Sequence, residues 1–355
     1  MKNNYKSSGT TSLFSEEFRL EKLSKQGDPL EKLNKVIDWS IFRNTVEKVL
    51  NDKKMVQSGP KPYDPLLMFK ILILQRYYNL SDEQTEYQIL DRVSFGRFLG
   101  LSLNDKVPDE KTIWDFKDRL IKKGLDKELF DLFTRLLDKY GLIAHEGKIV
   151  DASFVETPRQ RNSREENKKI KNGEVPQEWD KHPAKKRQKD TDARWTKKNN
   201  ENHFGYKNHV KVDTKHKFIE KALTTDASVH DSQALEKLLD EKDQGQEMHA
   251  DSAYTGKEQA KVLKKYKLKN RVHEKGKRNN PLTPKQIRAN HEKSKVRARV
   301  EHVFGFMEQS MNKLYLRSIG MARAQGFVNL VNLTYNLFRY EQVTRINGIS
   351  MPFCQ

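Results

Sequence analysis

The hydrophobic pattern of the chain changes near residue 147, and this change limits the folds that are open to it. Three segments from there alternate apolar and polar residues with the period of β-strands. Further along, helical and strand-like segments follow one another, which is typical of a mixed α/β domain. The expected strands are 148–156, 205–213, 217–225, 247–254 and 269–275, and the expected helices are 229–242, 256–267 and a segment through Glu301.

The first 143 residues instead show helix signals. Pro65 suits a first helical turn, Ser81 begins another helix as a cap, and Ile113, Phe116 and Leu120 share one face of a third. We expect an all-α domain over 1–143, which either reads DNA or serves in packing and dimerisation. The α/β domain then covers 144–345, and 346–355 form a tail.

The polar stretch 156–204 separates the first two expected strands. Its high charge predicts a loop-rich insertion, and Trp179 and Trp195 either stack on nucleic acid bases or anchor the loop; we favour anchoring. The apolar C-terminal segment carries Asn329, Asn332 and Asn336 on one helical face. This pattern predicts a buried helix with one polar seam.

The net charge is +19 over 355 residues. A charge of this size favours a polyanionic partner, with nucleic acid ahead of an anionic membrane, over a merely solvated basic surface. No segment approaches the length of a membrane span, and the N-terminus lacks a signal-peptide core. Cys354, the one cysteine, excludes an internal disulfide, and we expect a cytoplasmic protein.

Three acidic residues have local settings that suit a shared site. Asp151 and Asp251 each lie in a strand-like, apolar-flanked segment, and Glu301 lies on a helix beside its buried stripe. Each residue also has an ordinary explanation. Most aspartates are solvated or cap helices, as we expect for Asp226 and Asp231, and Glu301 is spaced for an ion pair with Arg297.

Two-metal phosphoryl transfer requires hard oxygen ligands for Mg²⁺ or Mn²⁺. The order of two strand aspartates and a helical glutamate is how a ribonuclease-H-like sheet gathers three carboxylates. We therefore predict Asp151, Asp251 and Glu301 as catalytic and metal-binding residues, with Asp151 bridging two ions.

A basic stretch precedes the glutamate. Residues 257–299 hold 16 Lys or Arg and three Asp or Glu. We expect this stretch to hold a phosphate backbone through salt-sensitive contacts. The predicted DNA-binding residues are Arg271, Lys275, Lys295, Arg297 and Arg299.

Several ordered motifs carry a resemblance. They are YDPLLMFKILILQRYYNLSDEQTEYQILDRVSFGRFLGL, VPDEKTIWDFKDRL, IVDASFVE, VHDSQALEKLL, HADSAYTGK and RARVEHVFG. Over residues 40–340 the chain resembles a bacterial insertion-sequence DDE transposase, of the family numbered five within the wider four/five-type superfamily. The resemblance places the catalytic acids on Asp151, Asp251 and Glu301. Of the related Tyr-Arg-Glu-Lys signature, Arg297 and Glu301 are present, while Ser294 and Glu308 replace the Tyr and the Lys.

The resemblance implies a ribonuclease-H-like domain with an insertion, Mg²⁺ (with Mn²⁺ as a substitute), and a bacterial, nucleoid-associated protein. It implies terminal inverted repeats and target double-stranded DNA as partners, and a homodimer or larger synaptic assembly. The expected reaction frees a 3′-hydroxyl at each element end and joins it to target DNA. Two alternatives are a metal-dependent nuclease without strand transfer and a non-catalytic DNA-binding descendant.

Overall fold

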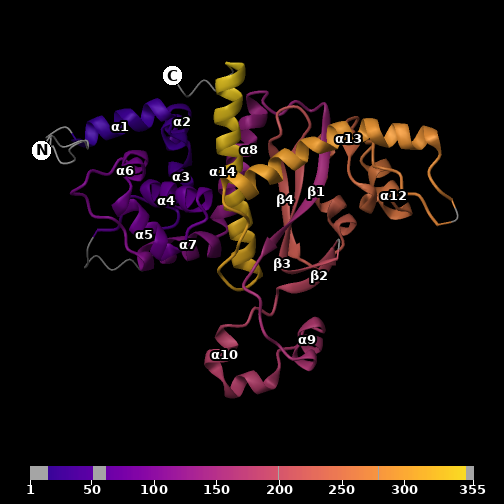
Figure 1. The fold of residues 1–355 in the computed structure, drawn as a ribbon, viewed down its shortest axis with the longest axis horizontal. Helices are drawn as coiled ribbons and strands as arrows, with labels where there is room; N and C mark the ends of the chain where they lie inside the picture. Colours follow the sequence, from indigo (N-terminus) through magenta and orange to yellow (C-terminus); the bar gives the residue numbers. More distant parts are fainter. Residues whose placement is uncertain (1–14, 51–60, 199, 279, 349–355) are drawn as a thin grey trace, which may run out of the picture.

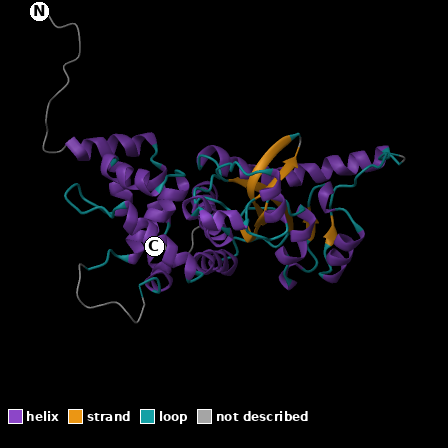
Figure 2. Cartoon of the chain, turned by 90° about the horizontal axis from the view of Figure 1, so that it is seen from below, coloured by secondary structure: helices purple, strands orange, loops and turns teal. Residues whose placement is uncertain are grey.

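The computed structural model describes residues 15–50, 61–198, 200–278 and 280–348. Strands occupy one half of the molecule, and the other half is helical (Figure 2). The long C-terminal helix α14 (Met321–Asn347) lies between the two halves and contacts both (Figure 1). Among the described helices, none has the combined length and apolar composition needed to cross a bilayer. Cys354, the one cysteine of the sequence, lies outside the described residues.

The helical half is built as its start signals predict. Asp64 caps α4 ahead of Pro65, and Ser81 forms a capping box with Gln84 at the start of α5. Ile113, Phe116 and Leu120 are all buried, which confirms the predicted face. The elements are α1 (Ser15–Gln26), α2 (Pro29–Val36), η1 (Trp39–Phe42), α3 (Arg43–Glu47), α4 (Pro65–Tyr77), α5 (Asp82–Asp91), α6 (Val93–Leu99), α7 (Glu110–Lys122) and α8 (Leu125–Lys139).

The sheet is mixed, with strand order β2-β3-β1-β5-β6 and with β4 paired to β3. The central strand β1 is antiparallel to β3 and parallel to β5. The strands are β1 (Gly147–Glu156), β2 (Arg194–Lys198), β3 (Glu201–Asp213), β4 (Ile219–Asp226), β5 (Glu247–His249) and β6 (Lys269–Asn270). The three strands predicted over 148–156, 205–213 and 217–225 are therefore present as β1, β3 and β4, which pair antiparallel with one another through β3.

Two predicted strands are much shorter than expected. The strand predicted over 247–254 ends at His249, because the Asp251 carboxylate accepts a hydrogen bond from the Ala253 backbone N–H and starts η5 (Ser252–Tyr254). The strand predicted over 269–275 keeps two residues. The helix predicted over 229–242 is divided into η3 (Asp231–Ala234), α11 (Leu235–Leu238) and η4 (Glu241–Asp243). Side-chain capping therefore overrides the strand-like pattern around Asp251.

Helices cover both faces of the sheet. On one face α14 packs against β4, and its polar seam is satisfied: Asn332 exchanges hydrogen bonds with Asn208, and Asn336 bonds the backbone of Ile219. On the other face α11 and α12 (Lys257–Lys265) enclose a smaller apolar core with Val150. The helix α13 (Pro284–Gly305) crosses β1 and continues into the short π-turn η6 (Phe306–Ser310) (Figure 1).

The insertion projects from the end of the sheet (Figure 1). It contains α9 (Arg164–Lys171), η2 (Gln177–Lys181) and α10 (Pro183–Arg187), while β2 and the first residues of β3 extend the sheet. Trp179 is fully buried and donates to the Glu166 carboxylate at 2.6 Å. Trp195 is 40% exposed and packs on Phe204. The anchoring role predicted for the tryptophans is thus confirmed for Trp179.

Candidate active site

Asp151 lies near the middle of β1. Alternation along the strand separates it from its neighbour Val150, which packs in the α11–α12 core. The Asp151 side chain is 13% exposed, and its Oδ1 accepts the Ala152 backbone N–H at 2.8 Å. Burial raises the pKa of Asp151 to about 6, and the negative charge of Asp251 also raises it. A carboxylate in this setting favours a cation beside it.

Asp251 follows the neighbouring parallel strand. Ile149 of β1 pairs with His249 of β5, so Asp151 and Asp251 both lie two residues beyond this pair. The Asp251 Oδ1 accepts the Ala253 N–H at 2.8 Å, which fixes the carboxylate as the cap of η5. Parallel register and capping together bring the two predicted aspartates to one place.

Glu301 is connected to this pair through an arginine. Arg297, one turn earlier on α13, donates from Nη2 to the Glu301 Oε1 at 2.7 Å and from Nη1 to the Asp151 Oδ2 at 3.3 Å. The Glu301 side chain is 58% exposed, whereas that of Arg297 is 24% exposed. The i,i+4 ion pair considered from the sequence is therefore present. The same guanidinium lies between the first and third predicted acids.

The oxygen donors fit a hard divalent cation. Beside the aspartates, the hydroxyl of Tyr254 is buried without a hydrogen-bond partner, and the charges of Asp151 and Asp251 raise the pKa of Tyr254 further above the value that burial gives. Within the described part of the chain, however, no three His, Cys, Asp or Glu side chains lie close enough to surround one ion. Asp151 and Asp251 are brought together, and Arg297 holds Glu301 in an ion pair.

Two residues at the site were not among the predicted ones. Tyr254 lies in η5, directly after Asp251 and its turn. His273 follows β6, and its backbone N–H donates to the Ala250 carbonyl at 3.1 Å. Burial lowers the pKa of His273, and Arg297 and Lys293 lower it further. Its position next to a parallel strand end was the available signal, because such ends gather at one edge of a sheet.

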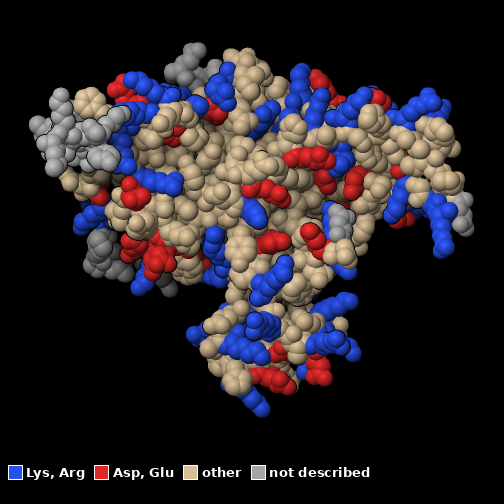
Figure 3. All heavy atoms as spheres, in the orientation of Figure 1, with Lys and Arg blue, Asp and Glu red and all other residues tan. Residues whose placement is uncertain are grey.

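The predicted DNA-binding residues are spread along the basic stretch 257–299, which we call the basic arm. Arg297 is in the site itself, but Arg299 donates to the Thr214 carbonyl at 2.5 Å and so faces another direction. Lys295 pairs with Glu292 at 2.7 Å, Arg271 pairs with Glu247 at 2.7 Å, and Lys275 is exposed. Lys and Arg side chains gather over the projecting end of α13 (Figure 3). The structure thus assigns only Arg297 to direct contact with the acids.

A hollow of about 430 Å³ begins at Ala152, the residue after Asp151. Its wall includes Ala152, Phe154, Lys198 and His203. The rings of Phe154 and His203 stack at 4.0 Å, and the Lys198 ammonium lies 5.7 Å from the Phe154 ring. An aromatic surface with a cation beside the acids is suited to a nucleic acid strand.

The chain matches two known protein families. Residues 18–119 match the family described as Transposase domain (DUF772), and residues 144–337 match the Transposase DDE domain family. The second match covers more than half of the chain. The chain belongs to the DDE transposase family. The predicted fold class, a helical N-terminal region followed by a ribonuclease-H-like mixed sheet, is confirmed.

The chain also has a weak similarity to a solved structure described as a cryo-EM structure of the piggyBac transposase synaptic complex with hairpin DNA. It is 11% identical in sequence, the match covers 91% of this chain and 75% of that one, and the TM-score is 0.42. DDE transposases generally use a divalent metal ion. For this member of the family, the adjacent aspartates are the oxygen donors that fit one.

Proposed function

We propose that this DDE transposase cleaves the terminal inverted repeats of an insertion sequence and joins the freed 3′-hydroxyls to target DNA. The observation that carries the proposal is the proximity of Asp151, on β1, to Asp251, which lies two residues beyond the end of the parallel strand β5 in a DDE domain. The motifs quoted above support membership of the insertion-sequence family numbered five. The helical N-terminal region, taken as 1–143, then serves DNA binding or dimerisation, and 144–345 form the catalytic domain.

Asp151, Asp251 and Glu301 are the proposed ligands of Mg²⁺ or Mn²⁺. Two such ions would activate the attacking oxygen and stabilise the departing one. The residues of the chain supply the rest: Asp151 and Asp251 provide fixed negative charge, and Arg297 neutralises Glu301 until the ions and DNA are present. The 3′-oxygen–phosphorus bond breaks as water attacks, and the freed 3′-hydroxyl then attacks a target phosphodiester and displaces its 3′-oxygen.

The basic arm supports DNA as the partner. Arg271, Lys275, Lys295, Arg297 and Arg299 belong to this arm, and we propose that it holds the phosphate backbone of the repeat or of the target. Joining two element ends requires two sites, so we propose a homodimer or larger synaptic assembly in the bacterial cytoplasm, on the nucleoid.

The test is cleavage and strand transfer on a labelled duplex that carries the end of the element, with Mg²⁺ or Mn²⁺. We expect nicked and joined products from the wild type. In Asp251→Asn the cleavage rate should fall by about 10³-fold, which corresponds to about 4 kcal/mol of transition-state stabilisation. Asp226→Asn is the matched control, because the Asp226 carboxylate accepts hydrogen bonds from the backbone and the hydroxyl of Ser228 at a turn.

Three other outcomes would change the proposal. Nicking without joined products would indicate a nuclease that does not transfer strands. Binding of the end without cleavage, unaffected by Asp251→Asn, would indicate a DNA-binding descendant. Equal losses in Asp251→Asn and Asp226→Asn would remove Asp251 from the site.

A further inference from the structure

A second cavity of about 380 Å³ lies where the helical half, α14 and the insertion meet. Its wall combines residues from α4, α5 and α7 with the segment 315–319, and Arg187 of α10 reaches it from the insertion. Ile121, Phe327 and Leu330 give it an apolar side. None of the predicted site residues lines this cavity.

The innermost cation of the cavity has an unused donor. Arg76 is 8% exposed, and its guanidinium lies over the Phe327 ring at 4.8 Å. One amino group of Arg76 donates to the side-chain oxygen of Gln75, but its Nε has no hydrogen-bond partner. A buried guanidinium N–H without a partner is costly, and an anion in the cavity would satisfy it.

Positive charge exceeds negative charge around the cavity. Its wall holds five cations and two acids, and the two acids already have partners: Asp82 pairs with Lys117, and Asp118 pairs with Arg323 at 3.0 Å. Arg317 is exposed and donates to the Asn79 side-chain oxygen at 2.9 Å. The five cations are Arg76, Lys117, Arg187, Arg317 and Arg323. This excess favours a ligand with negative charge.

An exposed aromatic ring completes the wall. Trp114 of α7 is 47% exposed, and the Arg323 guanidinium lies 5.9 Å from its ring. A flat aromatic side chain beside cations is the arrangement on which nucleic acid bases stack. The cavity therefore offers separate places for a phosphate and for a base.

The cavity shares a wall residue with the hollow that begins next to Asp151. Tyr315 lines both this cavity and the hollow beside Asp151, and it bridges to Glu156 at the end of β1. Glu156 is five residues from Asp151, a distance of about 17 Å along a strand. This distance is about five nucleotide steps of a B-form strand.

We propose that this cavity binds one nucleotide of a DNA single strand that continues from the acids along this route. Its phosphate contacts Arg76 and Arg317, and its base stacks on Trp114. The inference rests on the proposed function in one respect, that the strand comes from a DNA substrate. The recognition itself needs no metal ion and no cleavage.

The test measures how tightly the protein binds a fluorescein-labelled ten-nucleotide DNA single strand. Binding is monitored by fluorescence anisotropy in the presence of EDTA. We expect Trp114→Ala to weaken binding by about 5- to 150-fold, and Trp114→Phe to retain most of the affinity because it keeps a ring. We expect Arg317→Gln to reduce the salt dependence, the slope of log K against log salt, by about 0.7.

The matched controls are Tyr87→Ala, which removes an aromatic ring that is 65% exposed on α5, and Arg135→Gln, which removes an exposed arginine on α8; both should bind as the wild type does.

Each outcome decides the proposal. If Trp114→Ala and Arg317→Gln bind the strand as tightly as the wild type, the cavity is not its binding site. If dAMP or inorganic phosphate displaces the strand at a concentration near that of the strand itself, the ligand is a free nucleotide or phosphate, and the strand assignment is wrong. Thermal unfolding of each variant shows whether a loss reflects misfolding, and Arg317→Gln, at an exposed position, carries the test if Trp114→Ala does not fold.

Asp251→Asn separates this inference from the proposed function. It should bind the single strand as the wild type does while failing to cleave. If the wild-type protein cleaves no DNA, and the Trp114→Ala variant no longer binds the single strand, the transposase proposal is refuted and the cavity assignment is kept. The reverse pattern would refute only the cavity assignment.

Discussion

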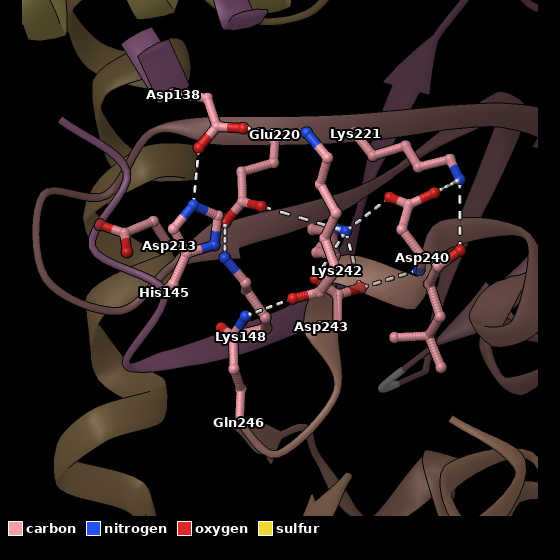
Figure 4. A network of polar contacts seen from close by, with 12 residues as sticks. Asp138, His145, Lys148, Asp213, Glu220, Lys221, Asp240, Lys242, Asp243 and Gln246 are labelled. Atoms are coloured by element: carbon pink, nitrogen blue, oxygen red, sulfur yellow. Dashed lines mark hydrogen bonds and ion pairs between the residues drawn. The ribbon is translucent and has the colours of Figure 1, made fainter. Parts of the chain in front are cut away.

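The strand β1 contributes to two charged sites of opposite character. Lys148, on the face covered by α11, is fully buried and pairs with Glu220, and the nearby Lys211 pairs with Asp240 and Asp243 (Figure 4). Three residues after Lys148, Asp151 lies near Asp251, where Arg297 is its ion-pair partner and Lys198 is a more distant positive charge. The first site contains its own cations and is structural. The second has an excess of acid, which is why we assign it to function.

The lysine network should show the largest effect on folding. Lys211→Met leaves Asp243, whose side chain is 1% exposed, without its cation, and we expect unfolding to become about 3–5 kcal/mol easier. Urea denaturation measures this. The double variant Lys211→Met/Asp243→Leu should recover much of the loss, and Lys261→Met, at an exposed pair with Glu258, should change stability by less than about 0.5 kcal/mol. A small loss in Lys211→Met would mean that the network is not self-contained.

Asp151 should behave in the opposite way. Its pKa of about 6 in the folded protein lies above the ordinary 3.8, so the folded state binds the proton more tightly. The free energy of unfolding therefore falls as pH rises from about 4 to 6, and the full cost is present above pH 6. We expect Asp151→Asn to stabilise the metal-free protein at pH 8 by at most about 3 kcal/mol, and to have little effect at pH 4. Destabilisation at pH 8 would show that the carboxylate is already compensated.

The sequence predicted these two sites unequally. The two aspartates could be predicted as site residues because strand ends and the quoted motifs are local signals. The lysine network was not, because Lys148 and Lys211 occupy alternating strand positions that resemble a solvent-facing side. In the fold they pair with acids that are distant in the sequence, Lys148 with Glu220 and Lys211 with Asp240 and Asp243, and no local pattern records such a pairing. The same limit applies to β2, whose charged sequence RWTKK conceals an edge strand.

The pH dependence of Mn²⁺ binding should also distinguish the acidic site at Asp151 from the lysine network. Below pH 6 a proton occupies Asp151, so we expect Mn²⁺ affinity to fall about tenfold for each further pH unit. Isothermal titration calorimetry with Mn²⁺ between pH 5 and 8 measures this. Asp151→Asn, which has no such proton, should bind weakly at every pH. A wild-type affinity that does not vary with pH would place the ion elsewhere.

The smallest effect should come from Arg297, the cation that Asp151 and Glu301 share. Arg297→Gln breaks an i,i+4 pair with the exposed Glu301 and also leaves the mostly buried Asp151 without its ion-pair partner, so stability at pH 8 should fall by about 1 kcal/mol. Removing the positive charge 3.3 Å from the Asp151 Oδ2 should, however, increase Mn²⁺ affinity at pH 8 by about fivefold, about 1 kcal/mol.

Two further measurements of Mn²⁺ binding test the role of Arg297. Because Arg297 lowers the pKa of Asp151, the pH midpoint of Mn²⁺ binding should move upward in Arg297→Gln and stay in place in Arg297→Lys, which keeps the charge. If Arg297→Gln binds Mn²⁺ more weakly than the wild type at pH 8, then the guanidinium organises the carboxylates instead of competing with the ion. The excess of acid would in that case be smaller than the contrast with the lysine network implies.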